Sequence, residues 1–172
     1  MILNATKEYF VKRKYIKLLA RTTGNRPFGT IESVGLIYNA KHFVEKPDWS
    51  SLVGFLPKNT TVKAVCFMDE KPSETPDNVL FFNEKDIGGL GKIKNPAIAE
   101  FTKTPFDLLV GYFDTENLFL NLLVAQSQAQ FKAGLRSEEP KLYDLMINSE
   151  EGDRDQFIIE LHKYLKILKR LD

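Results

Sequence analysis

The chain has 172 residues, which is the length of a single domain spanning residues 1–172, and it is 43% hydrophobic and 27% charged, as soluble globular proteins are. Its net charge of +1 argues against a general nucleic-acid-binding protein, because such proteins carry a marked basic excess. Its single cysteine, Cys66, excludes an internal disulfide and a cysteine-cluster zinc site. No segment reaches the roughly 20 apolar residues of a membrane span, and the N-terminus lacks the apolar core of a signal peptide, so we expect a cytoplasmic protein.

The first half of the chain predicts helices and strands in alternation. Val11, Tyr15 and Leu18 recur at helical spacing and define one apolar stripe. The expected elements are a helix at 5–22, a strand at 30–40, a short helix at 47–56 with Asp48 as its N-cap, and strands at 61–70 and 78–83. The link at 71–77 has two prolines and is too short for a helical crossover, so we expect the last two strands to be antiparallel neighbours.

The second half continues the alternation. Asn95 followed by Pro96 is a good helix start. The expected elements are a helix from Asn95 to Lys103, a strand at 106–113, a helix over 116–130 capped by Asp114 or Thr115, strands at 131–135 and 142–148, and a helix starting near Asp153. The pattern predicts a three-layer, Rossmann-like α/β domain with a mainly parallel sheet, one antiparallel hairpin strand, and flanking N- and C-terminal helices.

Two resemblances follow from quoted stretches of the sequence. The run "FDLLVGYFDTENLFLNLLVAQSQAQFKAGL", with "LYDLMIN" and "KDIGGLGK", resembles a family of uncharacterised proteins of about this length found mainly in Bacteroidota. That resemblance implies no activity. Residues 106–147 also look loosely like the N-terminal half of heptosyltransferase-type glycosyltransferases, which implies a fold but no substrate.

The stretch "IGGLGKIKN" (87–95) is the densest glycine segment. It fails the spacing of a P-loop because Ile93 stands where serine or threonine is required, and it also fails G-x-G-x-x-G. What remains is a possible anion site of Lys92, Lys94 and Asn95 at a helix N-terminus. The alternative is a flexible connector.

Polar residues follow several predicted strands. His42, Asp69 and Asp114 each come shortly after a strand that we expect to be parallel, so they could meet at the edge of the sheet where ligands bind. They could bind a divalent metal or act as an acid–base set. In the alternative reading, Asp114 caps a helix and the other two are solvated. No histidine or cysteine spacing typical of a metal site occurs, and we expect no cofactor.

The first helix is basic. Residues 1–26 hold seven basic residues against one acidic residue, and the strongest cluster is Lys12, Arg13, Lys14, Lys17 and Arg21. With the basic C-terminal helix on the same side, this would make a patch for a protein, RNA or anionic lipid, although a solvated face is the simpler reading.

Three functions therefore stay open. The first is a non-enzymatic protein that binds a partner. The second is a small ligand- or nucleotide-binding enzyme that uses the edge of the sheet. The third is an RNA- or ribosome-associated protein that uses the basic helices.

Overall fold

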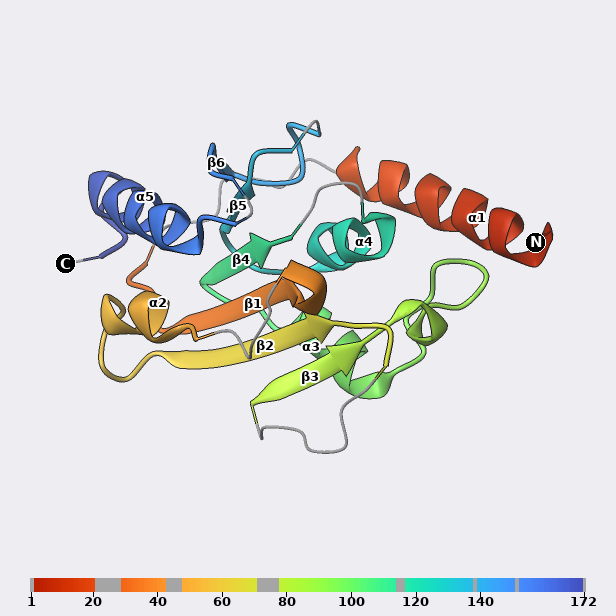
Figure 1. Ribbon diagram of the computed structural model, residues 1–172, viewed down its shortest axis with the longest axis horizontal. Helices are drawn as coiled ribbons and strands as arrows, with labels where there is room; N and C mark the ends of the chain where they lie inside the picture. The colour runs from red at the N-terminus through yellow and green to blue at the C-terminus, as the bar shows by residue number, and fades with distance from the viewer. Residues whose placement is uncertain are drawn as a thin grey trace.

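A computed structural model describes residues 2–20, 29–42, 48–70, 78–113, 117–137, 139–150 and 152–171. These residues form an α/β fold in which helices flank a six-stranded sheet (Figure 1). The strands are β1 (Ser33–Asn39), β2 (Thr61–Phe67), β3 (Val79–Phe82), β4 (Leu108–Tyr112), β5 (Lys132–Leu135) and β6 (Leu145–Ile147). Their order across the sheet is β3-β2-β1-β4-β5-β6, and every neighbouring pair is parallel.

Helices cover both faces of this sheet. They are α1 (Ile2–Leu19), α2 (Ser50–Gly54), α3 (Pro96–Lys103), α4 (Leu118–Gln126) and α5 (Arg154–Ile167), with 3-10 turns η1 (Ala40–His42) and η2 (Glu84–Asp86). On β1, Leu36 and Ile37 point to opposite faces, as successive strand residues do. Ile37 packs in a core with α1, α3 and α4, while Leu36 packs in a second core with α2 and α5. Near-continuous apolar strands are therefore explained by burial on both faces.

The predicted antiparallel hairpin is wrong. Strand β3 pairs parallel to β2, with Ala64 opposite Val79 and Phe67 opposite Phe82. The prediction assumed longer strands and hence a shorter link, whereas β2 ends at Phe67 and β3 begins at Val79. An extended chain covers about 3.3 Å per residue, so the longer link is long enough to return across a four-residue strand and start a parallel one.

Some predicted helix starts are confirmed and others are wrong. The Asn95 side chain accepts the Ala97 amide at 3.0 Å, and Asp153 accepts the Gln156 amide at 3.0 Å, so both cap helices as expected. Helix α4, however, is capped by Asn117 rather than by Asp114 or Thr115. Helix α2 is shorter than predicted, and its N-cap is Trp49, which makes no capping hydrogen bond. The Asp48 side chain instead accepts a hydrogen bond from the backbone amide of Ser50 at 2.8 Å.

The strand order determines where a ligand could enter. The order 3-2-1-4-5-6 is that of doubly wound sheets, in which the direction of winding reverses between the first and fourth strands. Here that point lies between Asn39, which ends β1, and Tyr112, which ends β4. All six strands are parallel, so the carboxyl ends of β1, β2, β3 and β4 share one edge of the sheet.

Candidate functional site

Helix α1 is held to the rest of the domain by two of its lysines. Lys7 donates a hydrogen bond to the carbonyl of Glu84, and its ammonium group lies 5.2 Å from the centre of the Phe119 ring. Lys14 donates to the carbonyl of Gly91 at 2.7 Å. Glu84 and Gly91 follow β3, and Phe119 lies in the first turn of α4 after β4, so α1 bridges segments that leave the carboxyl edge of the sheet. Figure 1 shows α1 beside α4 and the loop after β3.

The glycine loop is the surface on which α1 docks. Within it, the Gly88 amide donates to the Lys92 carbonyl at 2.8 Å and the Gly91 amide donates to the Gly88 carbonyl at 2.9 Å. Gly91 has a φ of 69°, and a Cβ there would lie 3.0 Å from Cδ of Lys14 and 3.6 Å from Cα of Val11. The amides of Gly88 and Gly91 are therefore used within the loop, and Gly91 leaves room for the backbone of α1. A phosphate cradle would need those amides free to converge on one anion.

The predicted anion site lies at the end of this loop. Asn95 directs its side-chain oxygen to the Ala97 amide of its own helix, while Lys92 and Lys94 are exposed. The expected antiparallel hairpin would have placed this loop at the opposite edge of the sheet, but β3 is parallel to β2, so the loop leaves from the carboxyl edge. Anion binding by these three residues stays a prediction.

The predicted basic cluster is divided by the docking of α1. Lys14 is partly buried against the loop, and this burial lowers the pKa of its ammonium group. Lys12, Arg13 and Lys17 are exposed, and Arg21 lies outside the described residues. Only part of the cluster is therefore free to meet another molecule.

Two apolar side chains lie among the exposed cations. Tyr9 and Ile16 are 61% and 56% exposed. They are seven residues apart and therefore lie on one side of the helix, with Lys12 and Arg13 placed between them along the chain. We call Tyr9, Lys12, Arg13, Ile16 and Lys17 the outward face of α1. The buried stripe on the other side includes Val11, which is fully buried, and the partly buried Tyr15 and Leu18.

The two basic helices do not form a joint patch. Helix α1 packs in the core shared with α3 and α4, whereas α5 packs in the core on the opposite face of the sheet. Figure 1 shows them at opposite ends of the view. On α5, moreover, Lys163 is paired with Glu160 at 3.1 Å, and this hydrogen bond raises the pKa of the lysine. Helices α1 and α5 therefore place their cations on different surfaces.

Polar side chains at and after the ends of the central strands accept hydrogen bonds from backbone amides. Asn39 is buried and accepts the Lys41 amide at 3.1 Å. Asn117 accepts the amides of Phe119 and Leu120, both at 3.1 Å. The first turn of α4 therefore has its amides satisfied by its own cap, and a phosphate is not required there.

The structure describes only some of the side chains in the predicted acid–base set. Asp69 is exposed just beyond β2, Asp114 lies outside the described residues, and His42 ends η1 with a side chain outside the described part of the chain. Within the described ranges, no three histidine, cysteine or acidic residues are grouped as a metal site requires. The strands bring the ends of β1, β2 and β4 together, and the joint action of the three residues stays a prediction.

Residues 7–168 match the model of DUF6913, a family of unknown function. The chain belongs to this family. No curated protein and no solved structure matches it. The prediction of an uncharacterised family is confirmed, while the Bacteroidota source and the heptosyltransferase likeness stay predictions. No helix in the described part of this DUF6913 chain is long and apolar enough to cross a membrane.

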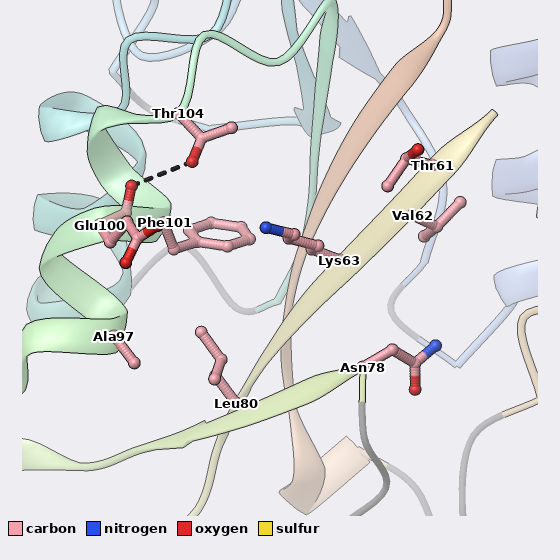
Figure 2. Close-up of a pocket in the computed structure, with 9 residues that line it drawn as sticks. All are labelled: Thr61, Val62, Lys63, Asn78, Leu80, Ala97, Glu100, Phe101 and Thr104. Atoms are coloured by element: carbon pink, nitrogen blue, oxygen red, sulfur yellow. Dashed lines mark hydrogen bonds between the residues drawn. The ribbon is translucent and has the colours of Figure 1, made fainter.

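A solvent-exposed groove of this protein lies elsewhere. It has a volume of about 430 Å³ and is open to solvent between α3 and the amino ends of β2 and β3. Figure 2 shows Lys63 extending toward Phe101 and Glu100 across it. The groove begins at Thr61, the first residue of β2, and so lies at the end of the strands away from the carboxyl edge. It holds no cluster of polar groups aimed at one point, so we do not place a catalytic site there.

Sequence reasoning missed the docking contacts of α1. Lys7 and Lys14 are seven residues apart, which already places them on one side of the helix, but nothing in the sequence identifies their carbonyl acceptors at Glu84 and Gly91. For the outward face, the same spacing of Tyr9 and Ile16 was the available signal. Aromatic residues interleaved in a basic helix fit packing into the core equally well. The sequence alone therefore did not identify Tyr9 as exposed.

Proposed function

We propose that this DUF6913 domain is a non-enzymatic binding protein that acts in the cytoplasm and binds an anionic partner through the outward face of α1. The observation that carries this proposal is the division of the lysines in α1. Lys7 and Lys14 fasten the helix to the domain, while Lys12, Arg13 and Lys17 remain exposed. Glu8 is the one acidic residue in the sequence of α1, so the helix presents a concentrated positive charge on a protein of nearly zero net charge.

A docked helix is a better binding surface than a free one. Isolated helices of fewer than about 15 residues are marginal in water, and longer ones still fray, so a free segment must be ordered when it binds. Here Val11 is fully buried and the contacts at Glu84 and Gly91 hold the helix in place. The cations of the outward face are therefore already arranged before a partner arrives, which lowers the entropic cost of binding.

Binding to a soluble polyanion tests this function. We would label the protein and titrate it with heparin, following fluorescence anisotropy at low and high salt. The outward-face charge variant carries Lys12→Glu, Arg13→Glu and Lys17→Glu together. We expect the wild type to bind in low salt and to be released as salt screens the charges, and we expect the variant not to bind.

A matched control separates local from total charge. Lys58, Lys103 and Lys166 are exposed outside α1, and their replacement by glutamate changes the net charge by the same amount. This control should bind heparin nearly as well as the wild type. Equal losses in both variants would mean that overall charge, rather than α1, determines binding, and the proposed function would be withdrawn. An RNA oligonucleotide titrated in the same way measures whether nucleic acid is the preferred anion.

A second candidate is a ligand-binding or enzymatic site at the carboxyl edge of the sheet. It is favoured by the strand order, since doubly wound sheets bind ligands where their winding reverses. Asp69, Asp114 and His42 would supply metal ligands or acid–base groups. Mn²⁺ should then raise the thermal midpoint of the wild type but not that of Asp69→Asn or Asp114→Asn, with metal-free midpoints unchanged. No shift with Mn²⁺ in the wild type would argue against a metal site there.

A further inference from the structure

The outward face of α1 combines charge with exposed apolar surface. Tyr9 and Ile16 are each more than half exposed, and the exposed cations Lys12, Arg13 and Lys17 lie on the same side of the helix. The exposed side of a surface helix carries mainly charged and polar side chains. Binding through charge alone therefore does not explain the exposure of these two apolar residues.

The arrangement of these residues limits the chemistry of the partner. On a helical projection, Tyr9 and Ile16 lie near the middle of the outward face, with Lys12 on one flank and Arg13 and Lys17 on the other. A phosphate backbone could pair with the cations but has nothing apolar to meet Ile16. A partner that accepts apolar side chains in the centre and cations on both flanks satisfies the whole face.

We propose that the anionic partner of α1 is the surface of a membrane that contains acidic phospholipids. This inference rests on the proposed function and names the partner. Helices that lie in the plane of a membrane place apolar side chains below the headgroups, while lysine and arginine extend back to the phosphates. Tyr9 suits the boundary between headgroups and acyl chains because its ring is apolar and its hydroxyl is polar. The helix binds along the surface and does not cross the bilayer.

The position of α1 allows a flat surface to reach it. In Figure 1 the helix lies at the edge of the molecule, beside α4 and beyond the ends of the strands, and its N-terminal end projects past the other elements. Helix α5 also exposes isoleucines, Ile159 at 58% and Ile167 at 64%. Its charges nearly balance, however, because it holds Asp155 and Glu160 against Arg154, Lys163 and Lys166, and Lys163 is paired with Glu160. Charge complementarity with an acidic membrane therefore selects α1 over α5.

Co-sedimentation with vesicles tests the proposal. Vesicles of phosphatidylglycerol and phosphatidylcholine in equal parts would be compared with vesicles of phosphatidylcholine alone. We expect the wild type to sediment with the acidic vesicles and to stay in solution with the neutral ones. The variant Lys12→Glu, Arg13→Glu and Lys17→Glu should bind about a hundredfold more weakly, because each cation near an acidic membrane contributes substantially to binding.

An apolar variant separates insertion from charge. Replacing Tyr9 and Ile16 together by serine keeps every cation, so heparin binding should be unchanged while vesicle binding falls about tenfold or more. The matched control replaces Ile159 and Ile167 by serine, removing as much exposed apolar surface from α5, and should leave vesicle binding unchanged. Circular dichroism of all variants checks that α1 remains folded.

Different failures have different meanings. If the wild type binds heparin but not acidic vesicles, or if it binds an RNA oligonucleotide more tightly than the vesicles, the lipid proposal is overturned while the proposed function stands. Vesicle binding that is unaffected by the loss of Tyr9 and Ile16 also overturns the lipid proposal, since the apolar contact would then be absent. If the charge variant binds both heparin and vesicles as the wild type does, both proposals fail.

Discussion

Replacing Gly91 by alanine tests whether the glycine loop holds α1 in place. Gly91 has a φ of 69°, in the left-handed region where an L-residue with a Cβ is strained by about 1–2 kcal/mol. The new Cβ would also lie 3.0 Å from Cδ of Lys14, the side chain that donates to the Gly91 carbonyl. Moving that side chain weakens a hydrogen bond with a net contribution of about 1 kcal/mol, so we expect a total loss of about 2–3 kcal/mol.

Two measurements would detect this loss of stability. Thermal unfolding monitored by circular dichroism should show a lower midpoint, by about 2–4 °C for each kcal/mol in a chain of this size. Hydrogen exchange should show where stability is lost. Amides in α1 should exchange at least five- to thirtyfold faster, because about 1–2 kcal/mol corresponds to that change in the population of the open state. Amides in the central strands β1 and β4 should change less.

The same loop supplies the control. Gly89 has no atom within 4 Å of the position that a Cβ would take, so Gly89→Ala should leave both the midpoint and the exchange of α1 unchanged or slightly improved. The reasoning would be refuted if Gly89→Ala and Gly91→Ala had equal effects, or if Gly91→Ala lowered the midpoint without faster exchange in α1. Either result would mean that α1 does not depend on the close approach at Gly91.

Buried contacts elsewhere give three more expected outcomes. A Cβ on Gly134 would lie 2.3 Å from Cζ of Tyr143, so Gly134→Ala should lower the free energy of unfolding by about 1–3 kcal/mol or more. The cost should shrink in a Tyr143→Leu background, which urea denaturation of the four proteins would measure, and an unchanged cost would contradict the contact. Asp107 accepts hydrogen bonds from two backbone amides at the start of β1 and from a glutamine side chain, so Asp107→Ala should lower the urea midpoint by an amount equivalent to about 2–4 kcal/mol. Burial and the charge of Glu139 raise the pKa of Tyr15 from 10.0 to about 12. The stability due to this proton is complete below pH 10 and is lost as pH rises to about 12, so Tyr15→Phe should make the urea midpoint less dependent on pH in that range.

The elements were predictable where local patterns suffice. The stripe of Val11, Tyr15 and Leu18 identified the inward side of α1, and Asn95 with Pro96 identified the start of α3. These predictions succeeded because periodicity and capping depend on residues that are close in sequence. The pairing of β2 with β3 was not predictable in the same way. Its direction depended on how far each strand extends, and strand ends are decided by contacts with distant residues.

For the candidate surface, the sequence by itself determined the composition of α1 and its helical periodicity, and hence that Tyr9 and Ile16 share a side with several cations. Tertiary structure alone decided which lysines remain available. Lys14 faces inward because the loop after β3 brings the Gly91 carbonyl to it, and that loop is positioned by parallel pairing across the sheet. Contacts between residues 7 and 84, and between 14 and 91, join segments far apart in the chain. No local pattern encodes them, because they exist only once the sheet has placed both segments at the same edge.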